Sequence, residues 1–185
     1  MTTEPNAKLP VLRQCQEAIE WLRHTRRETV TCLWFFRDLF ADPAAVHKDW
    51  KQVVDLMDST FNILLRGNQL TTDVLRKLVE LEGEDPTFRS VFAEKVERLE
   101  ATGVRSVRTV RRFAEAVDPN FFAADARRAR TPVYLTTDAD GTVLQNLQGY
   151  LRELEAIIDE EERQLVDMEG FLSLRGREME MGLTW

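Results

Sequence analysis

The chain has 185 residues, of which 43% are hydrophobic and 31% are charged, and its net charge is -7. This composition is ordinary for a soluble helical protein and too apolar for a disordered chain. No stretch approaches the 18 uninterrupted apolar residues of a membrane span, and residues 1–10 lack the apolar segment of a secretory signal. We therefore expect a cytoplasmic protein without a membrane partner, folded as one domain over residues 11–178.

The first predicted helix runs from Val11 to Phe40 and follows a flexible tail over residues 1–10. Its apolar residues recur at steps of three and four, which is the spacing of a coiled-coil-like seam. The seam consists of Leu12, Cys15, Ile19, Leu22, Arg26, Thr29, Leu33, Phe36 and Phe40. Cys15 and Cys32 lie 17 residues apart on this helix, so a rise of about 1.5 Å per residue keeps them too far apart for a disulfide. We expect both to be buried, reduced thiols.

The middle of the chain predicts a second long helix followed by short ones. Asp42 and Pro43 form a helix start signal and Gly67 a stop signal, so the second helix is expected over residues 43–66. Short helices are expected over residues 72–82 and 86–103, with helical spacing again over 104–117 and a helical turn over 118–130. Gly103 either separates two helices or lies within one, and we favour a break. Residues 131–143 favour an extended loop over a small hairpin, because an isolated hairpin is marginally stable in water.

The last long helix carries a second seam and ends near an apolar C-terminal tail over residues 179–185. Its seam consists of Leu144, Leu147, Leu151, Leu154, Ile158, Glu161, Leu165, Met168 and Leu172. Such a helix must lay its seam against partners, because amphipathic helices gain most of their stability from packing. The expected fold is all-α, an elongated helical bundle with long first, second and last helices and short helices packed across one end.

Arg26 and Glu161 interrupt the two long seams at matching depths. If the first and last helices pack antiparallel, Arg26 comes within one helical step of Glu161. A buried pair of this kind specifies the register of the helices more than it stabilises them. The alternative is that both residues lie at the seam edges and extend to solvent.

No motif in the sequence predicts catalysis, a metal or a cofactor. The Glu-x-x-His pattern of metal-binding bundles is not met, since Trp21 and Ala44 precede His24 and His47 by three residues. Glu20 and His24 are more simply a solvated helix pair. Neither cysteine has an evident base partner, and the glycines do not form a phosphate loop. We therefore expect a protein that is not an enzyme.

A basic stretch gives the strongest functional prediction. Residues 98–130 contain eight arginines and four acids, and Arg105, Arg108, Arg111 and Arg112 line one helical face, opposite Val107, Val110 and Val117. Arginine binds carboxylates and phosphates equally well, and residues 141–185 carry ten acids against four bases. Ion pairing within the chain or between subunits is therefore favoured over nucleic acid.

The predicted function is a non-catalytic protein–protein interaction protein, an assembly or adaptor subunit, with a protein partner or a second copy of itself. Its expected contacts are the exposed helix faces, the four arginines and the terminal Leu183 and Trp185, since large aromatic residues supply much interface energy. The alternative is a helical subunit of a nucleoprotein complex that holds phosphates through the arginine face. A weaker alternative is a small-molecule sensor with a pocket lined by Trp34, Phe35, Trp50 and Phe61.

Overall fold

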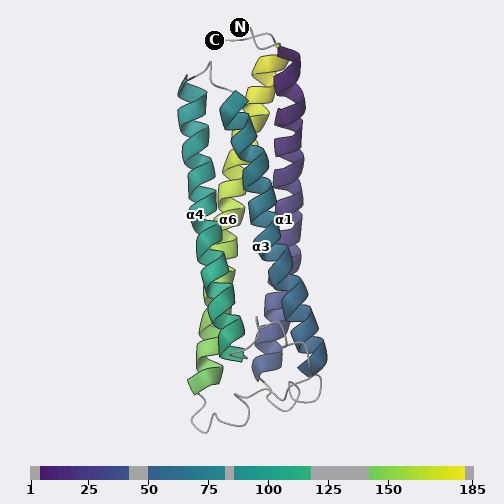
Figure 1. Ribbon diagram of the computed structural model, residues 1–185, viewed down its shortest axis with the longest axis vertical. Helices are drawn as coiled ribbons and strands as arrows, with labels where there is room; N and C mark the ends of the chain where they lie inside the picture. Colours follow the sequence, from purple (N-terminus) through teal and green to yellow (C-terminus); the bar gives the residue numbers. More distant parts are fainter. Residues whose placement is uncertain (1–4, 42–49, 82–85, 118–141, 182–185) are drawn as a thin grey trace.

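The computed structural model describes residues 5–41, 50–81, 86–117 and 142–181, and within these residues the protein is an all-α bundle. The four helices are α1 (Pro5–Ala41), α3 (Trp50–Leu81), α4 (Pro86–Val117) and α6 (Thr142–Glu180). All four are long and lie side by side along the longest axis of the molecule (Figure 1). The predicted fold class, an elongated all-α bundle, is confirmed.

The helices form an antiparallel ring. Helix α1 packs against α3 and α6, and α4 packs against the same two helices from the other side. The start of α1 and the end of α6 lie at the same end of the bundle, together with the end of α3 and the start of α4 (Figure 1). Successive helices in this ring therefore run in opposite directions, which is the simple up-and-down topology of a four-helix bundle.

Both predicted seams face the interior. Every seam residue of α1, from Leu12 to Phe40, is buried. In α6 the seam residues from Leu147 to Leu172 are buried as well, whereas the side chain of Leu144 lies outside the described residues. The spacing of three and four thus identified the inward faces of both helices correctly.

The interior consists of two apolar clusters separated by a polar layer. One cluster fills the half of the bundle that contains the start of α1, and it includes Leu12, Leu22, Phe92 and Leu172. The other fills the opposite half around Phe113, whose ring contacts those of Phe36, Phe40 and Phe61 at centroid distances of 5.6–6.4 Å. The buried residues between the two clusters are mostly polar or small: Thr25, Arg26, Thr29, Asn68, Thr71, Thr72, Thr102, Gly103, Ser106 and Glu161.

Two predicted helix boundaries are wrong, because Gly67 and Gly103 lie inside continuous helices. Residues 72–81 are the second half of α3, and residues 86–117 form one long helix, so these segments are not short helices across one end of the bundle. A glycine costs a helix only about 1 kcal/mol relative to alanine. A Cβ atom on Gly67 would lie 3.2 Å from Leu22 Cδ1, so glycine at this position permits close packing of α3 on α1.

The ends of the helices also differ from expectation. Helix α1 begins at Pro5, where proline is tolerated, so residues 5–10 of the expected tail are helical. Pro10 lies inside the helix, and its ring nitrogen has no N–H to donate to the carbonyl oxygen four residues earlier. Helix α6 ends at Glu180, so Met179 and Glu180 of the expected C-terminal tail are helical. The expected turn over 118–130, most of the expected loop over 131–143, and the terminal Leu183 and Trp185 lie outside the described residues.

Across the described ranges, none of the helices combines the length and the apolar character that crossing a membrane requires.

Candidate functional site

The centre of the polar layer is a buried group of three side chains from three helices. Arg26 of α1 donates from Nε to Glu161 Oε2 of α6 at 2.5 Å, and both side chains are almost completely buried. Asn68 of α3 donates from Nδ2 to Glu161 Oε1 at 2.8 Å and accepts a hydrogen bond from Arg26 Nη2 through its Oδ1 atom. Arg26 Nη2 also donates to the carbonyl oxygen of Leu64 at 3.3 Å. The structure thus brings together the two residues that interrupt the seams, and it adds Asn68.

The fourth helix contributes a glycine to the same layer. A Cβ atom on Gly103 of α4 would lie 2.9 Å from Asn68 Nδ2, closer than real Cβ contacts allow. Glycine therefore leaves the space in which the Asn68 amide reaches Glu161. All four helices meet at this level, which fixes their axial positions relative to one another.

Burial sets the electrostatics of the layer. Desolvation lowers the pKa of Arg26 from its ordinary value, and the neighbouring Glu161 carboxylate offsets part of that effect. Arg26 Nη1 is buried and has no hydrogen-bond partner among the described residues. A buried ion pair with an unsatisfied donor contributes specificity of register more than stability. We assign the Arg26–Asn68–Glu161 group a structural role.

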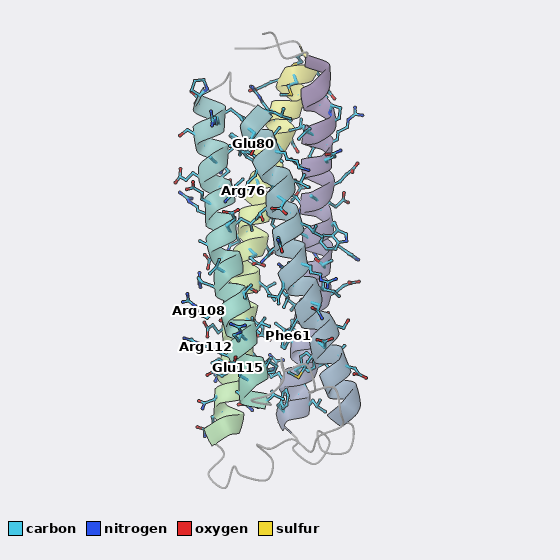
Figure 2. All side chains as sticks on the ribbon, viewed as in Figure 1. Phe61, Arg76, Glu80, Arg108, Arg112 and Glu115 are labelled. Atoms are coloured by element: carbon cyan, nitrogen blue, oxygen red, sulfur yellow. The ribbon has the colours of Figure 1, made fainter. Side chains whose placement is uncertain are left out.

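The predicted arginine face lies on the outside of α4. Arg105 donates from Nη1 to Glu160 Oε2 of α6 at 2.7 Å, and Arg111 lies 3.8 Å from Glu115 on its own helix. Arg108 and Arg112 are exposed and form no ion pair with another described residue. Figure 2 shows these two side chains projecting from the side of α4 that faces away from α3. We call Arg105, Arg108, Arg111 and Arg112 the arginine ridge.

Two exposed valines border the arginine ridge. Val104 and Val107 are 58% and 44% exposed, although they belong to a helix whose other apolar residues are mostly buried. Glu100 of α4 accepts from Arg76 of α3 at 2.5 Å, and Val104 and Val107 follow Glu100 by four and seven residues. They therefore lie on the side of α4 that borders α3, whereas Arg105 borders α6. The prediction that Val107 lies opposite the arginines is wrong, because Val107 is exposed beside them, whereas Val110 and Val117 are buried as predicted.

Several acids of α6 pair with basic side chains of α1 and α4. Glu162 accepts from Arg23 of α1 at 2.9 Å, and Glu169 accepts from the same side chain. Asp167 accepts from Lys95 of α4. The sequence favours ion pairing of the arginines within the chain or between subunits. Arg105 and Arg111 pair within the chain, whereas Arg108 and Arg112 form no ion pair with the residues that the structure describes.

Neither the Glu20–His24 pair nor the predicted small-molecule pocket is present among the described residues. His24 Nε2 is 3.3 Å from Glu28 Oε1, one turn further along α1, rather than paired with Glu20. Trp34 and Phe35 lie about half exposed on the outside of α1, whereas Phe61 is in the core, so these three do not line one pocket. The side chain of Trp50 lies outside the described residues.

The two cysteines are free thiols in different environments. Cys15 is fully buried, and its Sγ atom lies 3.6 Å from the carbonyl oxygen of Val74. Burial raises the pKa of Cys15 to about 12. Cys32 is only half-buried, contrary to the expectation that both would be buried.

Sequence reasoning missed two members of the central layer, Asn68 and Gly103. Asn68 follows the apolar Leu64, and Gly103 follows the apolar Leu99, each by four residues, but asparagine and glycine are also typical of turns, and Gly103 is predicted to break the helix. One signal could have identified them: Asn68 and Gly103 lie at the same position along the bundle axis as Arg26 and Glu161.

The described residues define the class of protein as an antiparallel four-helix bundle. A buried Arg–Asn–Glu group separates its two apolar clusters, and the outer face of α4 carries the arginine ridge. Comparison of the chain with protein-family models, with curated proteins and with solved structures finds no match.

Proposed function

We propose that this protein is a non-catalytic protein–protein interaction protein, an assembly or adaptor subunit, which binds its partner through the outer face of α4. The observation that carries the proposal is the combination of Arg108 and Arg112, which form no ion pair with described residues, and the exposed Val104 and Val107 beside them. Protein interfaces are enriched in arginine and place apolar side chains among polar ones.

The arginine ridge also provides electrostatic attraction toward an acidic surface. Residues 101–114 contain four arginines and no acid, whereas the whole chain has a net charge of -7. A local basic surface on an acidic protein attracts a complementary partner and orients it during association. We propose that the protein is located in the cytoplasm. We also propose that the terminal Leu183 and Trp185 form a second contact with the partner.

The proposal is tested by site-specific photo-crosslinking in the cells that express the protein. A photo-reactive amino acid replaces Val104, and a matched control variant carries it at Val166 of α6, which is similarly exposed (47%). We expect discrete protein adducts from position 104, few from position 166, and loss of the adducts when Arg108→Glu and Arg112→Glu are added.

A second charge reversal controls for the change in net charge. Arg66→Glu combined with Arg89→Glu alters the charge by the same amount at exposed positions on α3 and at the far end of α4. These changes should leave the adducts from position 104 in place. Absence of adducts would contradict the proposal, and adducts to nucleic acid would favour the nucleoprotein alternative.

A further inference from the structure

We infer that the partner presents a short acidic helix, whose carboxylates bind Arg108 and Arg112 and whose small apolar residues pack on Val104 and Val107. This inference rests on the proposed function, because it names the chemistry of the partner at the same surface.

The arginine ridge already binds carboxylates within its own bundle. Arg105 donates to Glu160 at 2.7 Å, and Arg111 lies within 3.8 Å of Glu115. A guanidinium group offers two parallel N–H donors that match the two oxygens of a carboxylate. Arg108 and Arg112 lie between these two pairs on the helix surface, so they present the same chemistry outward.

The length of the ridge favours a short acidic segment over a nucleic acid. Arg105 and Arg112 are seven residues apart, which corresponds to about 10 Å along the helix axis. Glu100 and Glu115, at the two ends of the ridge, are already paired with Arg76 and Arg111. Arg105 is paired with Glu160, so the ridge offers an incoming anion two guanidinium groups, Arg108 and Arg112, that form no ion pair with the described residues. A segment with two or three carboxylates matches this short basic surface.

The exposed valines favour a partner with an apolar stripe. A phosphate backbone has no apolar surface to cover Val104 and Val107, whereas an amphipathic helix covers them with residues spaced three and four apart. Such a helix carries its carboxylates beside the apolar stripe, opposite the arginines. The charge of the arginine ridge and the exposed valines beside it therefore both favour an acidic amphipathic helix as the partner segment.

The experiment measures the binding of three fluorescent probes to the full-length protein by anisotropy. The first probe is a capped amphipathic peptide of about 18 residues, long enough to be helical, with glutamates beside a leucine and alanine stripe. The second is the same peptide with glutamine in place of glutamate, and the third is a duplex DNA. We expect the glutamate peptide to bind at least tenfold more tightly than either of the others, and added salt to weaken its binding.

Three double variants test whether the glutamate peptide binds through the arginine ridge. R108E/R112E should weaken binding of the glutamate peptide at least tenfold, R108Q/R112Q should weaken it severalfold, and R66E/R89E should change it less than twofold. All of these arginines are exposed, so circular dichroism is expected to show unchanged helicity. Light scattering, recorded alongside, is expected to give a monomer mass near 21.5 kDa.

Three results would overturn the inference: equal binding of the glutamine peptide, tighter binding of the duplex, or a doubled mass that R108E/R112E abolishes, since a second copy would then occupy the ridge. Failure here is distinguishable from failure of the proposed function. Protein adducts at position 104 without binding of the acidic peptide would refute the acidic helix alone, whereas absence of adducts would refute the interaction surface itself.

Discussion

Replacement of Arg26 by methionine tests the buried layer most directly. Methionine keeps much of the length of the arginine side chain but removes the donors to Glu161, Asn68 and the Leu64 carbonyl. Glu161, which is completely buried, then keeps, among the described residues, only the hydrogen bond from Asn68 Nδ2 at 2.8 Å. Breaking a buried pair in this way costs about 3–5 kcal/mol. For a chain of this size that loss lowers the melting temperature by about 6–20 °C.

Two further variants separate the layer from a general effect of removing an arginine. Arg105→Met breaks a more exposed pair with Glu160 and should cost less than about 1 kcal/mol. The triple variant Arg26→Met, Asn68→Leu and Glu161→Met replaces the whole group with apolar side chains of similar size. It should return to within about 1 kcal/mol of the original protein or exceed it, because no buried polar atom of the group is left unpaired.

The measurement is urea unfolding followed by circular dichroism, with the free energy of unfolding extrapolated to water. The reasoning would be refuted if Arg26→Met cost no more than Arg105→Met. It would also be refuted if the triple variant were no more stable than Arg26→Met alone, since the loss would then not come from the uncompensated carboxylate.

The remaining predictions concern the glycines and the thiols. Gly103→Ala should lower the free energy of unfolding by about 1–3 kcal/mol, because its Cβ displaces the Asn68 amide from Glu161. Gly170→Ala, where a Cβ meets nothing within 4 Å, should raise it by up to about 1 kcal/mol, and the same urea assay checks both signs. A thiol reagent at pH 8 should modify Cys32 in the folded protein and leave Cys15 protected; equal rates would contradict the burial of Cys15. Because the pKa of Cys15 rises from 9.0 to about 12 on folding, its thiol contributes stability below pH 9 that is lost as the pH rises toward 12, and Cys15→Ala should remove that part of the pH dependence.

Much of the fold followed from local spacing. The steps of three and four identified the inward faces of α1 and α6, and they did so because every turn of a long amphipathic helix repeats the same requirement for burial. The errors concentrated at Gly67 and Gly103, where the residue type alone favours a helix end. Whether a glycine ends a helix or lies inside it depends on the side chain of a neighbouring helix, which local spacing does not contain.

The candidate surface was predicted in part. The four arginines were recognisable as one helical face, but their ion pairs were not, because Glu160 is distant in the sequence from Arg105. Only the packing of α4 against α6 assigns that carboxylate to Arg105 and leaves Arg108 and Arg112 facing outward. The exposure of Val104 and Val107 likewise depends on how far α3 covers α4.

The sequence by itself determined that this chain is helical and which stripe of its first and last helices is buried, because amphipathic periodicity is a local property of the chain. It also predicted that Arg26 comes within one helical step of Glu161 if the first and last helices pack antiparallel, but it left open whether the two side chains are buried together or extend to solvent. Only the tertiary structure decided that Asn68 and Gly103 belong to the same layer. Their roles depend on the 2.8 Å hydrogen bond and the close helix approach, which exist only once four separate segments have packed together.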